Sequence, residues 1–139
     1  MKFGNINYLA VLAAAVVAWL AGAVWYRALS KTWISALGMT PEKLHALQHH
    51  PGAYVPFIVS FLAELVMAWT LAGILFHVGS ITVRRGIIAG ALCWLGFVLT
   101  TMLVNHSFAR RDRRLTLVDG GHWLLVLVLM GAVLGALPP

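Results

Sequence analysis

Charged residues are scarce in this sequence. Only 10% of its 139 residues are Asp, Glu, Lys or Arg, whereas a soluble domain usually carries about 25%. Hydrophobic residues make up 61% of the chain, and they are gathered in long runs. The composition therefore predicts an all-α integral membrane protein, and the length predicts a single membrane domain covering residues 1–139.

Acidic residues are the scarcest charged type, with four Asp or Glu against ten Lys or Arg. Because the basic residues lie between apolar runs, we expect them to orient the chain and to contact anionic lipid, with no nucleic-acid partner. Cys93 is the single cysteine, which excludes a disulfide within the chain.

The motifs of common enzyme classes are also missing. We find no nucleophile elbow, phosphate-binding loop, zinc-protease motif or dinucleotide fingerprint. The sequence thus favours a protein that is not an enzyme, and it implies no cofactor.

Four apolar runs are each long enough to cross about 30 Å of hydrocarbon as a helix. Their continuity favours helices over barrel strands, which would alternate in polarity. We predict a four-helix bundle with spans at residues 6–26, 55–76, 86–104 and 115–137. A signal peptide is the alternative interpretation of the first run, because Lys2 precedes it and small residues lie near its end. The length of the run favours a retained span.

A polar loop, residues 27–54, separates the first two runs. Within it, Thr40, Pro41 and Glu42 form a typical helix start, and Pro51 breaks the helix. We predict a short amphipathic helical segment at the membrane surface.

Basic residues are unevenly divided between the two sides of the predicted membrane. The side with the first and third loops holds seven, and the other side holds Lys2, Arg84 and Arg85. Because basic loops stay in the cytoplasm, we predict that loops 1 and 3 are cytoplasmic and both termini are outside, in a bacterial inner membrane. Four of the seven are predicted to contact lipid headgroups: Arg110, Arg111, Arg113 and Arg114.

Small residues recur at a spacing of four in every span, which permits close helix packing. The rows are Ala14, Ala18 and Gly22; Ser60, Glu64, Ala68 and Ala72; Gly86 and Gly90; Gly131 and Gly135. Near the span ends, we assign Trp25, Tyr26 and Trp33 to an interfacial aromatic belt.

Glu64 lies about 14 Å into the second span, where a charged carboxylate costs at least about 2.5–3.5 kcal/mol. It is a candidate proton or cation site, or else a neutral carboxyl bonded across the bundle. Asp119 and His122 share a helix face. They could join Glu64 in a proton relay or hold a metal, although Asp119 as a helix cap is the favoured interpretation.

His45 and His49 are four residues apart in the loop, a spacing at which two histidines can share a metal. No clear third ligand accompanies them in that loop. A solvated histidine-rich surface is the favoured alternative.

Short motifs along nearly the whole chain carry a family resemblance. They are residues 22–26 (GAVWY), 31–33 (KTW), 37–40 (LGMT), 94–97 (WLGF) and 118–122 (VDGGH). In these the chain resembles a bacterial family of small four-span membrane proteins of unknown function, the domain numbered seventeen sixty-one. The resemblance implies a compact four-helix membrane protein and no activity. Such families carry an aromatic after the Asp-Gly pair, where this chain has His122.

Three functions follow as hypotheses. The leading one is a non-enzymatic homo-oligomer that binds or passes a small solute or ion, with Glu64 as its key residue. The second is a structural or accessory subunit that pairs with another membrane protein. The third is a metal-dependent membrane enzyme that uses His45, His49, His106 or His122.

Overall fold

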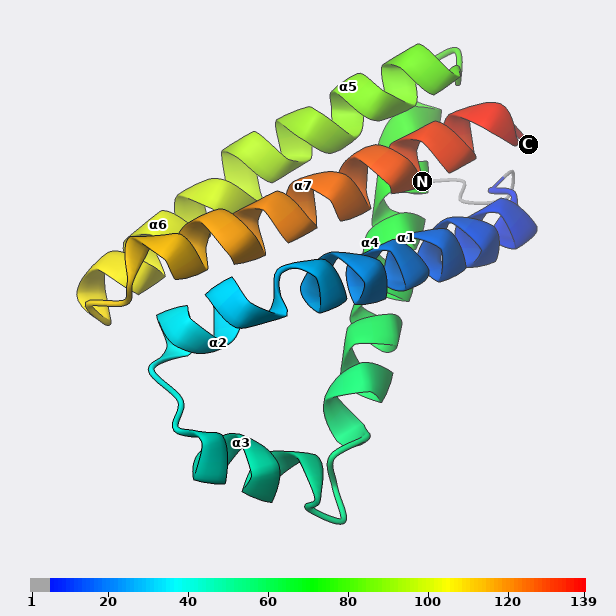
Figure 1. Ribbon diagram of the computed structural model, residues 1–139. Coiled ribbons are helices and arrows are strands. Elements are labelled where there is room, and N and C mark those ends of the chain that lie inside the picture. Colours follow the sequence, from blue (N-terminus) through cyan, green and yellow to red (C-terminus); the bar gives the residue numbers. More distant parts are fainter. Residues whose placement is uncertain (1–5) are drawn as a thin grey trace.

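The computed structural model describes residues 6–139, and its regular structure is entirely helical over that range (Figure 1). Four helical segments are long and apolar enough to cross a membrane, as the composition predicts. They are α1 (Tyr8–Ala28), α4 (Val55–Val78), the continuous segment Val83–Phe108 and α7 (Arg113–Ala136). The third consists of α5 (Val83–Cys93), a π-helical turn η1 (Trp94–Leu99) and α6 (Thr100–Phe108).

Two spans begin earlier than the hydropathy pattern suggests. The third begins at Val83, because the side chain of Thr82 accepts a hydrogen bond from the first turn and caps it. The fourth begins at Arg113, because Asp112 caps it in the same way. Basic residues in a first turn can remain helical while their long side chains extend toward water. Capping residues therefore set these boundaries, and the edges of the apolar runs do not.

The loop between the first two spans is helical, as predicted. It contains α2 (Ser30–Leu37) and α3 (Pro41–Gln48). Gly38 ends α2 with a φ of 66°, a conformation that glycine adopts without strain. Thr40 caps α3. No residue of α3 is buried, and its backbone approaches no other described helix; Figure 1 shows it apart from the other helices.

The long helices are arranged around α7. In Figure 1, α1 and the α5–α6 segment run alongside α7, one on each side, and α4 crosses behind α1. α4 packs against α1 and also contacts α7 and α5. The third span lies at the outside of the bundle. Within Val83–Phe108 only Gly86 and Gly90 are buried, and the other side chains are partly or fully exposed.

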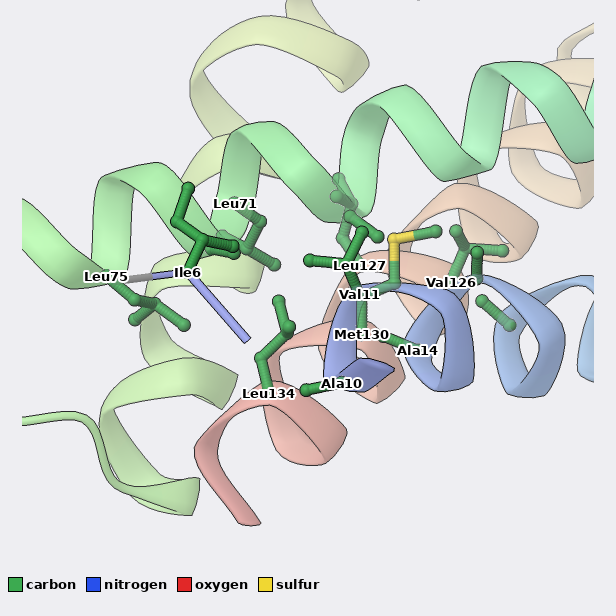
Figure 2. Packing of buried hydrophobic residues seen from close by; sticks show 14 residues of the cluster. Ile6, Ala10, Val11, Ala14, Leu71, Leu75, Val126, Leu127, Met130 and Leu134 are labelled. Atoms are coloured by element: carbon green, nitrogen blue, oxygen red, sulfur yellow. The ribbon is translucent and has the colours of Figure 1, made fainter. Parts of the chain in front are cut away.

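The core forms where α1, α4 and α7 meet (Figure 2). The predicted row of small residues on α1 is buried here, with Ala14 and Ala18 fully enclosed. Larger side chains such as Leu71 of α4 and Met130 of α7 fill the space that these alanines leave. Lipid gives no hydrophobic drive for helix association, so such dense packing is what holds the helices together.

α5 and α7 approach until their backbones touch. A Cβ added to Gly86 would lie 1.9 Å from the carbonyl oxygen of Gly131, and one added to Gly90 would lie 2.2 Å from that of Leu127. A Cβ on Gly135 would lie 2.4 Å from the carbonyl oxygen of Thr82. Because no side chain fits into these contacts, the two predicted glycine rows form the interface between these helices.

Candidate functional site

Glu64 lies near the middle of α4 with only 2% of its surface exposed. Its Oε2 atom has no hydrogen-bond partner among residues 6–139. An ionised carboxylate buried without a partner is strongly disfavoured. The position therefore calls for a neutral carboxyl or a bound cation.

The neighbours of Glu64 on its own helix offer it no polar partner. Ser60, one turn earlier, accepts a hydrogen bond from the indole of Trp19 at 3.0 Å and donates one to the carbonyl oxygen of Phe57 at 2.9 Å. Its hydroxyl proton is therefore already used. Ala68, one turn later, is fully buried. Glu64 and Ala68 are thus buried against protein, and Ser60, one turn earlier on the same face, is partly exposed.

Asp119 joins three helices. Its Oδ1 atom accepts a hydrogen bond from the hydroxyl of Tyr26 at 2.7 Å and one from the indole of Trp33 at 3.1 Å. Tyr26 lies near the end of α1 and Trp33 lies in α2, with their rings in edge-to-face contact. A single carboxylate oxygen on α7 therefore fixes the end of the first span and the helix that follows it.

The prediction that Asp119 caps the fourth span is wrong. Asp112 provides the cap, and Asp119 lies about two turns farther along α7. The Asp-Gly-Gly pattern looks like a helix entry, but here its glycines lie inside the helix. Gly121 lets the Trp25 ring approach α7, whereas a Cβ added to Gly120 would meet only the side chain of Leu99, at 3.8 Å.

His122 is a second buried polar side chain, with 6% of its surface exposed. Its ring lies against Gly22 of α1, where an added Cβ would come within 2.6 Å of Nε2. The ring centroid is 4.8 Å from that of Tyr26 and 4.7 Å from that of Trp123. Nδ1 of His122 has no hydrogen-bond partner in the described chain. His122 is thus enclosed by rings and backbone, with one ring nitrogen unused.

Two further indoles bond to the backbone of α7 around Asp119. Trp25 donates to the carbonyl oxygen of Val118 at 3.0 Å, and Trp94 donates to that of Gly120 at 2.8 Å. The ring of Trp25 fits because Gly121 has no side chain, since a Cβ there would lie 2.6 Å from the ring. These contacts tie the first and third spans to the same turn of α7.

Sequence reasoning placed Trp25, Tyr26 and Trp33 in an interfacial belt and missed their partners. All three donate hydrogen bonds to α7. The signal that could have revealed one of these contacts is Gly121, which leaves room for the Trp25 ring beside an apolar helix.

The structure brings together some of the predicted site residues. Asp119 and His122 both contact Tyr26, one by a hydrogen bond and the other through its ring. Glu64 stands apart, because no hydrogen bond or ion pair within residues 6–139 joins it to either residue.

The loop histidines interact with each other. The rings of His45 and His49 are stacked with centroids 4.0 Å apart, and Nδ1 of His49 lies 2.9 Å from the carbonyl oxygen of His45. His106 instead contacts Thr116 of α7 at 2.7 Å. Over residues 6–139, no group of three or more His, Cys, Asp or Glu is placed to hold a metal ion.

Of the four arginines predicted to contact lipid, Arg114 is already engaged. It forms an ion pair with Asp112 at 2.7 Å. The hydrogen bonds from Arg114 hold the pKa of the Asp112 carboxyl below its usual range. The other three line a groove beside this pair.

A family model described as "Protein of unknown function (DUF1761)" matches residues 9–135. The chain belongs to this family. The match covers every element described above except the ends, so the resemblance drawn from the short motifs is confirmed. Searches of curated proteins and of solved structures gave no match. The DUF1761 description names no activity, and function must therefore be argued from the site.

Proposed function

We propose that this DUF1761 protein binds a proton at Glu64 within the bilayer and passes it toward the face where α1 ends. The observation that carries the proposal is the burial of Glu64 in a membrane span with no partner for Oε2. Water exposure, pairing and protonation are the three ways to lower the cost of a carboxylate there. Glu64 is only 2% exposed, and Oε2 has no partner among residues 6–139, so protonation is the way that we propose.

The proton is the ion that this site fits best. A metal ion such as Ca²⁺ or Mg²⁺ needs several oxygen ligands. Glu64 is the acidic residue of its span, and the hydroxyl of nearby Ser60 already donates to a backbone carbonyl. A lone carboxyl can hold a proton without help from other side chains, and a proton needs no cavity.

A route for the proton follows from how α1 is packed. Trp19 of α1 bonds to Ser60, one turn before Glu64, and Gly22, three residues after Trp19, lies against His122. α1 and α4 run in opposite directions, because the start of α4 lies beside Trp19 and its end lies beside Ala10. Glu64 and His122 therefore reach α1 about two turns apart, and the step between them is the longest of the proposed route.

From His122 the next titratable groups are Tyr26, in ring contact, and Asp119, which is bonded to the tyrosine hydroxyl. The proposed route leads from the middle of the bundle to the end of α1, in the order Glu64, His122, Tyr26, Asp119. His122 suits the intermediate position, because its Nδ1 atom has no hydrogen-bond partner within the described chain and an imidazole nitrogen can accept a proton.

The test uses protein reconstituted in liposomes that contain a pH-sensitive dye. With a potassium diffusion potential imposed, we expect proton entry with the wild type and none above empty liposomes with Glu64→Gln. Glu42→Gln is the matched control, because it removes a carboxylate from α3, where no residue is buried. Its flux should equal that of the wild type.

Infrared difference spectra separate binding from passage. The carboxyl band that disappears in Glu64→Gln should change between its protonated and ionised positions as pH is varied. A band that keeps one position over the range in which the protein stays folded would refute proton binding at Glu64. Titration of that band without flux would leave a proton-binding site and refute passage.

The second candidate, an accessory subunit, is favoured by α3. This helix presents Leu44 and Leu47 without burying any residue against the described chain. A membrane-protein partner or a second copy would give α3 a surface to contact. Native mass spectrometry from mild detergent would distinguish a partner at fixed ratio, a homo-oligomer and a monomer, and recovery of a bare monomer from native membranes would refute the accessory role.

A further inference from the structure

A basic groove lies at the corner where α6 turns into α7. It encloses a volume of about 580 Å³, and three exposed arginines line it, Arg110, Arg111 and Arg113. His106 and Thr116 are bonded to each other at 2.7 Å and link the two helices inside it. The groove is independent of the site around Glu64.

The charge of this groove is not neutralised by the described chain. Asp112 is the acidic residue of the corner, and it is already paired with Arg114, which does not line the groove. No carboxylate is among the residues that line it. Three arginines therefore line one groove that has no carboxylate in its lining, a composition that suits a phosphate.

The other part of the groove is apolar. Leu103 of α6 and Leu117 of α7 line it, with 49% and 74% of their surfaces exposed. Both leucines lie about one turn inside the spans, whereas the arginines lie at the ends of the spans. The groove therefore changes from basic at the membrane surface to apolar along the helices. A free phosphate would use only the first part, but a phospholipid would use both.

We propose that this groove binds one anionic phospholipid, with its phosphate held by Arg110, Arg111 and Arg113 and an acyl chain lying along Leu103 and Leu117. The turn geometry supports this use. Arg110 has a φ of 49°, a left-handed conformation that is strained for an L residue and that glycine would adopt freely. A turn alone would favour glycine at this position, so the arginine here adds a positive charge that the turn itself does not require.

The experiment is native mass spectrometry of the full-length protein in mild detergent, titrated with phosphatidylglycerol or with phosphatidylcholine. We expect phosphatidylglycerol to be retained in preference to phosphatidylcholine. Each basic residue near an anionic lipid contributes about a fivefold factor in affinity. The double variant Arg111→Gln/Arg113→Gln should therefore bind phosphatidylglycerol about 30-fold more weakly.

The matched control is Arg84→Gln/Arg85→Gln, which removes the same charge from the start of α5, outside the groove. It should retain phosphatidylglycerol like the wild type. Equal losses in both variants would show general charge attraction and overturn the proposal, and so would an absence of loss in the groove variant.

A third arm distinguishes lipid from free phosphate. Leu117→Gln leaves the arginines in place, so it should weaken phosphatidylglycerol binding without changing the effect of added inorganic phosphate. If inorganic phosphate displaces the lipid completely and Leu117→Gln has no effect, the groove is a phosphate site and the lipid proposal fails.

Discussion

Substituting Gly86 by alanine tests the backbone contact between α5 and α7 directly. The new Cβ would lie 1.9 Å from the carbonyl oxygen of Gly131, and reaching even 3.0 Å requires the helices to separate by about 1 Å. Neither contacting atom can rotate away, because one is a Cβ and the other is backbone. Overpacking usually costs about 1–3 kcal/mol. We expect Gly86→Ala to lower the free energy of unfolding by about 3 kcal/mol, at the upper end of that range.

Gly96→Ala is the matched control in the same span, because nothing lies within 4 Å of its added Cβ. Alanine is favoured over glycine in helices by about 1 kcal/mol, so this variant should be as stable as the wild type or slightly more stable. Gly131→Ala should destabilise like Gly86→Ala. The double variant should cost less than the sum, because one separation of the helices relieves both clashes.

The assay is equilibrium unfolding in mixed micelles, with dodecyl sulfate added to a mild detergent and helix content followed by circular dichroism. Cys93 provides a second probe, because this single thiol is partly buried at the end of α5. It should react faster with a thiol dye as the helices separate. If Gly86→Ala and Gly96→Ala unfold at the same dodecyl sulfate fraction, the close contact between α5 and α7 does not exist as described.

Three other predictions concern the polar groups and the topology. Tyr26→Phe removes the hydrogen bond to Asp119 and should cost about 1.5–3 kcal/mol in the same unfolding assay; an unchanged stability would refute the bond. The Asp112 cap should be present above the pKa of an unfolded Asp, about 4, and be lost as pH falls through the lower folded pKa. Hydrogen exchange in the first turn of α7 should rise at that pH, and Asp112→Asn, which also caps but does not titrate, should abolish the effect. For topology, with Cys93 replaced by alanine, a cysteine at Gln48 should react with an impermeant reagent only from the cytoplasmic side and one at Ser80 only from outside, and the reverse pattern would overturn the predicted orientation.

The four spans could be predicted because hydropathy acts over whole segments and does not depend on tertiary contacts. Thr40 could likewise be identified as a cap from its immediate neighbours. The glycine rows at residues 86–90 and 131–135 were predictable as close-packing faces. The sequence did not show that these two glycine rows would pack against each other.

The candidate site was harder to predict because its partners are far apart along the chain. Tyr26 and Asp119 are separated by 93 residues, and no local pattern links them. Asp119 was misjudged because Asp112, seven residues earlier, competes for the same capping role and lies next to the charged turn. Glu64 stood out from the cost of a carboxylate in hydrocarbon, but only the structure shows that its Oε2 atom has no partner.

The π-helical turn at Trp94–Leu99 changes how the third span should be numbered along its face. A π turn holds one more residue than the α-helical turn that it replaces. A helical wheel drawn from Gly86 with a constant 3.6-residue period therefore assigns the residues after Leu99 to the wrong direction. A relative that lacks one residue within this stretch would have an ordinary α-helical turn there. Its four spans would keep the same order and direction.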